Sequence, residues 1–191
     1  IQKILEKNYE VFYFAGEDDY RRIHTRMTQL GIDSERVLFS AGRVSPLAPK
    51  GKDAIDEIRE IILSRPAIKA VFIDTMASIM TGRIDLSDYF GFVERLKPWA
   101  DLASELDINI TMVHHSVKGN SQPEHNPLNL VLGSQAIAGA FDTNMTMYRA
   151  ADGNGATLYL TGKDVEENEK NKPKKNNKIK HSKIFLSILL Q

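Results

Sequence analysis

One stretch, residues 69–80 (KAVFIDTMASIM), constrains the fold more than any other part of the chain. Its apolar run at residues 70–73 is rich in β-branched and aromatic side chains and passes directly into Asp74 and Thr75. Such a run is typical of a strand buried on both faces in the middle of a parallel sheet. A carboxylate at the end of that strand lies at the sheet edge where open α/β folds bind ligands. Asp74 is therefore a candidate functional residue, and capping of the following turn is the equally weighted alternative.

The rest of the chain alternates strand and helix patterns. Strands are predicted at residues 11–15, 36–40 and 108–113, helices at residues 20–30, 53–64 and 89–106, and a strand pair at residues 143–149 and 156–161. This order predicts an α/β fold with a mostly parallel central sheet, helices on both faces and an antiparallel strand pair at the C-terminal end. We expect a core at residues 1–167 and a basic, flexible tail at residues 168–191. Within that tail, residues 184–190 are apolar and fit either a docked strand or a helix.

Composition excludes several kinds of site. Lysine plus arginine (25) equals aspartate plus glutamate (25), so the global charge gives no argument for nucleic acid or a membrane surface. The chain has no cysteine, which excludes disulfides and thiolate metal sites and favours a cytoplasmic location. No signal peptide is found, and no apolar run approaches the roughly 20 residues of a membrane helix, so we expect no membrane partner. The chain begins at Ile1, and we therefore expect a fragment or a processed product.

Polar side chains follow three of the predicted strands where each strand ends. They are Glu17, Asp74 and the pair His114 and His115. Two carboxylates and a neutral polar group at one edge suit metal-bound phosphate chemistry, because one carboxylate can hold Mg²⁺ and the other can orient or deprotonate water. Adjacent histidines on a strand point to opposite faces, so a sensor or hydrogen-bonded role is favoured over a shared metal ion. The acidic residues at 18–19 fit a helix N-terminus, which leaves Glu17 as the functional candidate.

Five segments together resemble the RecA-like P-loop ATPases, and among them the RepA-type hexameric replicative helicases of plasmids and phages. They are FAGEDD (residues 14–19), VFIDTMAS (71–78), MVHHSVKG (112–119), GSQAIAGAFD (133–142) and LYLTGKD (158–164). The resemblance covers about residues 1–167. It implies a RecA-like three-layer α-β-α sandwich, with ATP and Mg²⁺ as cofactors. It also implies single-stranded DNA as a partner, self-association into a hexameric ring and a role in DNA replication or recombination.

The resemblance also assigns roles to individual residues. Glu17 would activate water, Asp74 would bind Mg²⁺ with Thr75 beside it in the nucleotide site, and His115 or His114 would couple the γ-phosphate to the DNA-binding loop. Contacts with DNA are implied for Lys118 in the loop at residues 116–132 and for Arg83 in the loop at residues 81–88. Contacts with the nucleotide of the neighbouring subunit are implied for Lys163 and Arg149. The basic run at residues 170–183 is more typical of a solvated tail than of a nucleic-acid site.

The chain departs from the family at the phosphate-binding loop. The pattern G-x-x-x-x-G-K-[ST] does not occur, because Gly51-Lys52 and Gly162-Lys163 are each followed by Asp. The favoured explanation is that the loop is encoded upstream of Ile1; the other is that the protein is a non-hydrolysing relative. Without the loop, this chain is expected to bind ATP poorly. The leading prediction is a ring-forming helicase-type ATPase. The alternatives are a catalytically silent DNA-binding or oligomerisation module and a truncated remnant.

Overall fold

The structure is a computed structural model of the whole chain. It describes residues 8–32, 35–41, 54–80, 88–115, 139–149, 155–162, 165–173 and 184–189. Two of the predicted loops lie wholly or mostly outside these residues, at 81–88 and 116–132.

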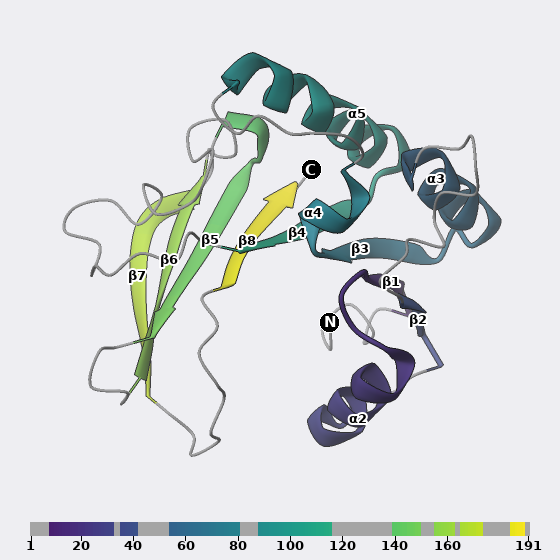
Figure 1. Cartoon of the computed structure of the whole chain (residues 1–191), viewed down its shortest axis with the longest axis horizontal. Helices are drawn as coiled ribbons and strands as arrows, with labels where there is room; N and C mark the ends of the chain where they lie inside the picture. Colours follow the sequence, from purple (N-terminus) through teal and green to yellow (C-terminus); the bar gives the residue numbers. More distant parts are fainter. Residues whose placement is uncertain are drawn as a thin grey trace.

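The described strands form one eight-stranded sheet in the order β2-β1-β3-β4-β8-β5-β6-β7 (Figure 1). The strands are β1 Glu10–Ala15, β2 Val37–Ala41, β3 Ile68–Asp74, β4 Asn109–His115, β5 Thr143–Arg149, β6 Gly155–Gly162, β7 Val165–Pro173 and β8 Ile184–Leu189. Strands β2, β1, β3 and β4 pair in parallel. Strands β5 and β6 pair antiparallel, as do β6 and β7. The predicted parallel sheet and the antiparallel strand pair are both confirmed.

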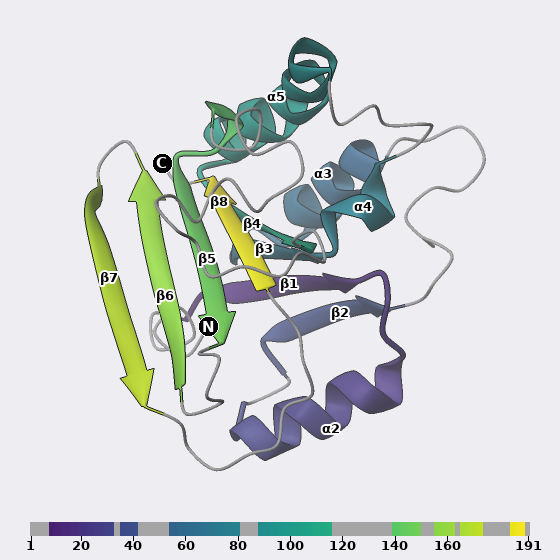
Figure 2. The same ribbon diagram turned by 60° about the vertical axis from the view of Figure 1, so that its left-hand side comes forward.

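Helices cover both faces of the parallel half of the sheet. They are α2 Tyr20–Leu30, α3 Ala54–Ser64, α4 Met76–Ile79 and α5 Tyr89–Leu106. Helix α2 lies on one face, and α3, α4 and α5 lie on the other (Figures 1 and 2). The larger core packs β-strand residues such as Phe14 and Ile73 against Ile58 and Leu96 of α3 and α5. A smaller core on the opposite face includes Val11 and the half-buried Met27 of α2. This three-layer α/β arrangement is the predicted RecA-like fold.

The ends of α2 follow directly from the sequence. The Asp19 carboxylate accepts a hydrogen bond from the backbone N–H of Arg22 at 2.9 Å and so caps the helix N-terminus. Gly31 adopts the left-handed conformation, with φ of 63°, and its N–H satisfies carbonyls of the last turn. The predicted helix at residues 20–30 and its stop at Gly31 are therefore confirmed. Helix α5 also matches its predicted range and contains Pro98.

The C-terminal segment contributes two strands to the sheet. Strand β8 pairs antiparallel with both β4 and β5. The apolar run at residues 184–190, for which a strand and a helix were both considered, therefore forms a strand. The predicted boundary at residue 167 falls inside β7, and the division into core and tail stays a prediction. Within the described ranges, no helix has the length and apolar character needed to cross a membrane.

Candidate functional site

The candidate site lies where β1 and β3 end side by side. The two strands are neighbours in the sheet, and Ala15 is paired with Asp74 in their parallel register. The backbone N–H of Gly16 then donates to the carbonyl oxygen of Asp74 at 2.6 Å, which extends the ladder one step beyond β1. The register therefore brings Glu17 and Thr75, which follow the two strands, to the same edge.

Gly16 lets the turn after β1 lie directly against α4. A Cβ atom at this position would lie 2.3 Å from both Cβ and Oγ of Ser78, a separation at which real atoms clash. Ser78 belongs to α4, the short helix that follows Asp74 and Thr75. The absence of a side chain at position 16 thus sets how closely the chain carrying Glu17 approaches the chain carrying Thr75.

Glu17 and Thr75 are joined by a hydrogen bond. The Thr75 hydroxyl donates to Oε1 of Glu17 at 2.9 Å. Thr75 is only 1% exposed, whereas Glu17 is exposed. A carboxylate that reaches solvent is therefore held at one oxygen by a hydroxyl fixed in the protein interior. Thr75, and not Asp74, occupies the N-cap position of α4.

Asp74 accepts a hydrogen bond from Tyr13, a residue that the sequence analysis did not single out. The phenol O–H of Tyr13 donates to Oδ2 of Asp74 at 2.9 Å. The Tyr13 ring stacks on Phe72, with centroids 6.4 Å apart and planes 26° apart. Burial, followed by the negative charge of Asp74, raises the pKa of Tyr13 well above its ordinary value of 10.0, so the phenol keeps its proton. One signal was available: a tyrosine in a buried strand needs a partner for its hydroxyl.

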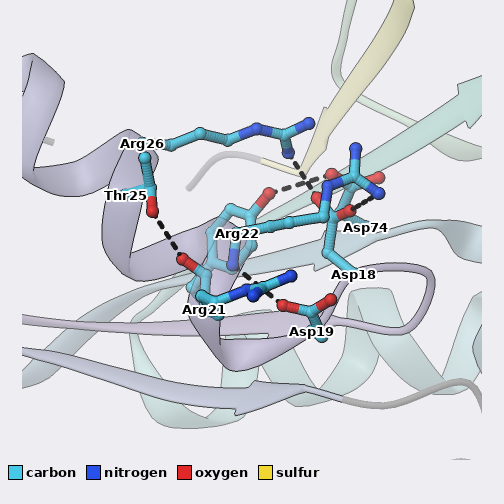
Figure 3. Close-up of polar contacts among 8 residues, drawn as sticks. Asp18, Asp19, Arg21, Arg22, Thr25, Arg26 and Asp74 are labelled. Atoms are coloured by element: carbon cyan, nitrogen blue, oxygen red, sulfur yellow. Dashed lines mark hydrogen bonds and ion pairs between the residues drawn. The ribbon is translucent and has the colours of Figure 1, made fainter.

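Asp18 forms a second polar group beside Asp74 (Figure 3). Its carboxylate pairs with Arg22 at 2.8 Å and with Arg26, and its side chain is 14% exposed. Its charge also contributes to the raised pKa of Tyr13, while that of Arg26 opposes it. Asp18 and Asp19 are thus engaged in ion pairing and in capping of α2. This agrees with their assignment to a helix N-terminus rather than to chemistry.

The histidines lie at the end of the next strand. Val113 is the register partner of Asp74, so alternation along β4 places His114 with Met112, on the face opposite the Asp74 side chain. The Nε2 atom of His114 is buried, and His115 is the last residue of β4. Among the described residues, no group of three or more His, Asp or Glu side chains could hold a metal ion by itself.

Of the remaining predicted site residues, the structure describes only Arg149, which lies away from this cluster. Arg149 is the last residue of β5, and two strands, β4 and β8, separate β5 from β3 in the sheet. Lys163, Lys118 and Arg83 fall outside the part of the chain that the structure describes. The roles assigned to these four residues stay predictions.

The residues at this edge fit a magnesium–nucleotide complex in their chemistry. Mg²⁺ prefers oxygen ligands, and it is commonly held by one or two carboxylates together with the phosphates of a substrate. Asp74 supplies a carboxylate, Thr75 supplies a hydroxyl, and Glu17 supplies a second carboxylate that reaches solvent. A site of this kind needs no cluster of three protein carboxylates.

Comparison with known proteins identifies a family. A family model with the description "AAA domain" matches residues 3–121, which is more than half of the chain. The matched range includes β1, β3 and β4, and therefore Glu17, Asp74 and Thr75. No curated protein gives a significant match.

Proposed function

Because the chain belongs to the AAA domain family, we propose that it acts as an ATPase at the edge formed by β1 and β3. The observation that carries the proposal is the 2.9 Å hydrogen bond between Thr75 and Glu17, which joins the ends of two strands that are 58 residues apart in sequence. It places a solvent-reaching carboxylate beside the residue that follows Asp74. This is the arrangement that a water-activating base and a magnesium ligand require.

Each residue has a separate part in hydrolysis. Asp74 would hold Mg²⁺, Thr75 would lie beside it in the nucleotide site, and the bound ion would neutralise charge on the phosphates. Glu17 would orient a water molecule and accept its proton as the water oxygen bonds to the γ-phosphorus and the bond to the ADP oxygen breaks. The exposure of Glu17 supports this role, because its carboxylate must meet water as well as nucleotide.

We further propose that the ATPase works as a helicase-type ring that moves along single-stranded DNA in plasmid or phage replication. In this arrangement Lys163 and Arg149 contact the nucleotide of the neighbouring subunit. His115 or His114 relays the state of the γ-phosphate to a DNA-binding loop that contains Lys118, and Arg83 makes a second DNA contact. These roles rest on the resemblance to RepA-type helicases.

Nucleotide binding and turnover test the proposal. ATP with Mg²⁺ is titrated calorimetrically into this chain and into a version extended upstream to include any encoded phosphate-binding loop. Glu17→Gln is expected to keep binding but to lower hydrolysis by about 10²- to 10⁴-fold, as expected for loss of a general base. Glu94→Gln is the matched control, because it makes the same change on an exposed part of α5. Equal turnover in the two variants would refute the role of Glu17.

A second function is favoured by one observation, the absence of G-x-x-x-x-G-K-[ST] from residues 1–191. A chain of this fold without the phosphate cradle would serve as a DNA-binding or oligomerisation module. Failure of both versions to bind ATP, together with retained binding of single-stranded DNA or self-association, would favour this module over the ATPase.

A further inference from the structure

Two hydroxyl groups cross between β1 and β3 in opposite directions. Tyr13 of β1 donates to Asp74, the last residue of β3. Thr75, which follows β3, donates to Glu17, which follows β1. Each carboxylate of the proposed site is therefore held by a hydroxyl from the other strand.

The geometry of the sheet explains the contact between Tyr13 and Asp74. Tyr13 is the register partner of Phe72, and Asp74 lies two positions beyond Phe72 on the same face. The phenol thus reaches diagonally across the two strands toward their carboxyl ends. The Tyr13 ring also stacks on Phe72, which restricts its orientation and so favours the contact of its hydroxyl with Oδ2 of Asp74.

The contact between Thr75 and Glu17 departs from the usual behaviour of its position. Threonine at an N-cap ordinarily accepts a hydrogen bond from the first turn of its own helix. Thr75 makes no such side-chain capping bond to α4. Its hydroxyl instead donates to Glu17, across to the turn that follows β1. The Thr75 hydroxyl therefore serves the contact between the two strand ends and not the capping of its own helix.

We infer that Tyr13 and Thr75 are positioning residues, Tyr13 for the magnesium-binding carboxylate of Asp74 and Thr75 for the water-activating carboxylate of Glu17. The inference rests on the proposed ATPase function. Hydrogen-bonding groups behind a metal ligand or a base fix its orientation before the substrate arrives, and their loss commonly costs 10- to 100-fold in metal affinity or activity. Because the two hydroxyls hold different carboxylates, their removal should affect different kinetic constants.

The test measures ATP hydrolysis as a function of Mg²⁺ concentration in the form of the chain that hydrolyses ATP. Tyr13→Phe is expected to raise the Mg²⁺ concentration at half-saturation about 10-fold, with kcat at saturating Mg²⁺ nearly unchanged. Thr75→Val keeps the shape of the buried side chain and is expected to lower kcat about 10-fold or more, with the Mg²⁺ dependence unchanged. Thr75→Ser retains the hydroxyl and should restore most of kcat. Tyr9→Phe, at a 40% exposed tyrosine just before β1, is the control for loss of a phenol oxygen.

A merely structural role for Tyr13 would lower kcat and stability without moving the Mg²⁺ half-saturation point, and that result would overturn the inference. So would a Tyr13→Phe profile that matches Tyr9→Phe. A second measurement needs no hydrolysis: the urea-unfolding midpoints of Tyr13→Phe, Asp74→Ala and the double variant. Coupled residues give a double variant less destabilised than the sum of the two single variants. Coupling in a chain without ATPase activity would refute the proposed function alone, whereas strictly additive effects would refute the contact.

Discussion

Replacement of Gly16 by alanine should lower the free energy of unfolding and disturb the contacts between the turn after β1 and α4. The added Cβ would lie 2.3 Å from both Cβ and Oγ of Ser78, so either the turn after β1 or α4 must move. Overpacking of this kind costs about 1–3 kcal/mol. Two neighbouring hydrogen bonds depend on the same approach, from Gly16 N–H to the Asp74 carbonyl and from Thr75 to Glu17. We therefore expect a loss near the upper end of that range, measured by urea unfolding followed by far-UV circular dichroism.

A double-mutant cycle separates this clash from a general effect of losing glycine. Ser78→Gly removes both clashing atoms, so it should recover much of the loss caused by Gly16→Ala, with a coupling of about 1 kcal/mol or more. Gly31→Ala is the matched control: position 31 has a φ of 63°, and an added Cβ would meet no atom within 4 Å beyond its chain neighbours, so its cost of about 1–2 kcal/mol comes from backbone strain alone. The cost of Gly31→Ala should be unaffected by Ser78→Gly. If Gly16→Ala and Ser78→Gly are additive within about 0.5 kcal/mol, the argument from close approach is wrong.

Three further changes test the surroundings of the site. Leu102→Ala should cost about 2–5 kcal/mol in urea unfolding, because this side chain of α5 is fully buried in the larger core; a smaller loss would contradict that packing. Asp19→Ala should cost about 1 kcal/mol by the same assay, while Asp19→Asn, which can still cap α2, should cost little. The hydrogen bond from Arg65 holds the pKa of Glu10 in the folded protein below its ordinary 4.5. The pair therefore stabilises the fold at pH values above the pKa of Glu10 in the unfolded chain, and this contribution is lost as the pH falls through the lower pKa of the folded protein. Glu10→Gln should therefore reduce the fall in stability on acidification below about pH 4.5, and an unchanged pH profile would refute the pairing.

The arrangement of the parallel half of the fold could be predicted from local patterns. The apolar run that ends at Asp74 has the composition of a central strand, and β3 occupies that position between β1 and β4. Helix α2 could be bounded because Asp19 and Gly31 carry capping chemistry at its two ends. These signals act within a few residues, so they remain readable without knowledge of the rest of the chain.

The C-terminal strands gave weaker signals for physical reasons. Strand β7 has the sequence VEENEKNKP, in which no apolar alternation marks a buried face, and its pairing with β6 at the sheet edge comes from backbone hydrogen bonds. Strand β8 has only six residues, and a short apolar run fits a strand or a helix equally well. Its position between β4 and β5 is decided by tertiary pairing, which periodicity does not reveal.

The sequence was sufficient to predict which strand ends form the candidate site, but not how the side chains at those ends are arranged. Because parallel strands end at one edge, Glu17 and Asp74 could be expected near each other, and the register places both at the ends of neighbouring strands. The same rule placed His114 at that edge, but it gave no information on which face of the sheet the side chain occupies. Alternation along β4 sets that face, and it separates His114 from the Asp74 side chain.

The hydrogen-bond partners of the two carboxylates depend on the pairing register of β1 and β3, which the sequence of either strand alone does not determine. Tyr13 meets Asp74 because it is paired with Phe72, and a slip of one residue between β1 and β3 would carry its ring to the opposite face. Phe12 and Phe14 are both buried in the larger core, and this fixes the register, since the same slip would turn both rings out of that core and toward the α2 face. The hydrophobic pattern of β1 therefore sets the position of a hydroxyl that contacts the site. A substitution at Phe12 or Phe14 that shifts the strand should disturb the Asp74 side chain, even though neither phenylalanine side chain can form a hydrogen bond with it.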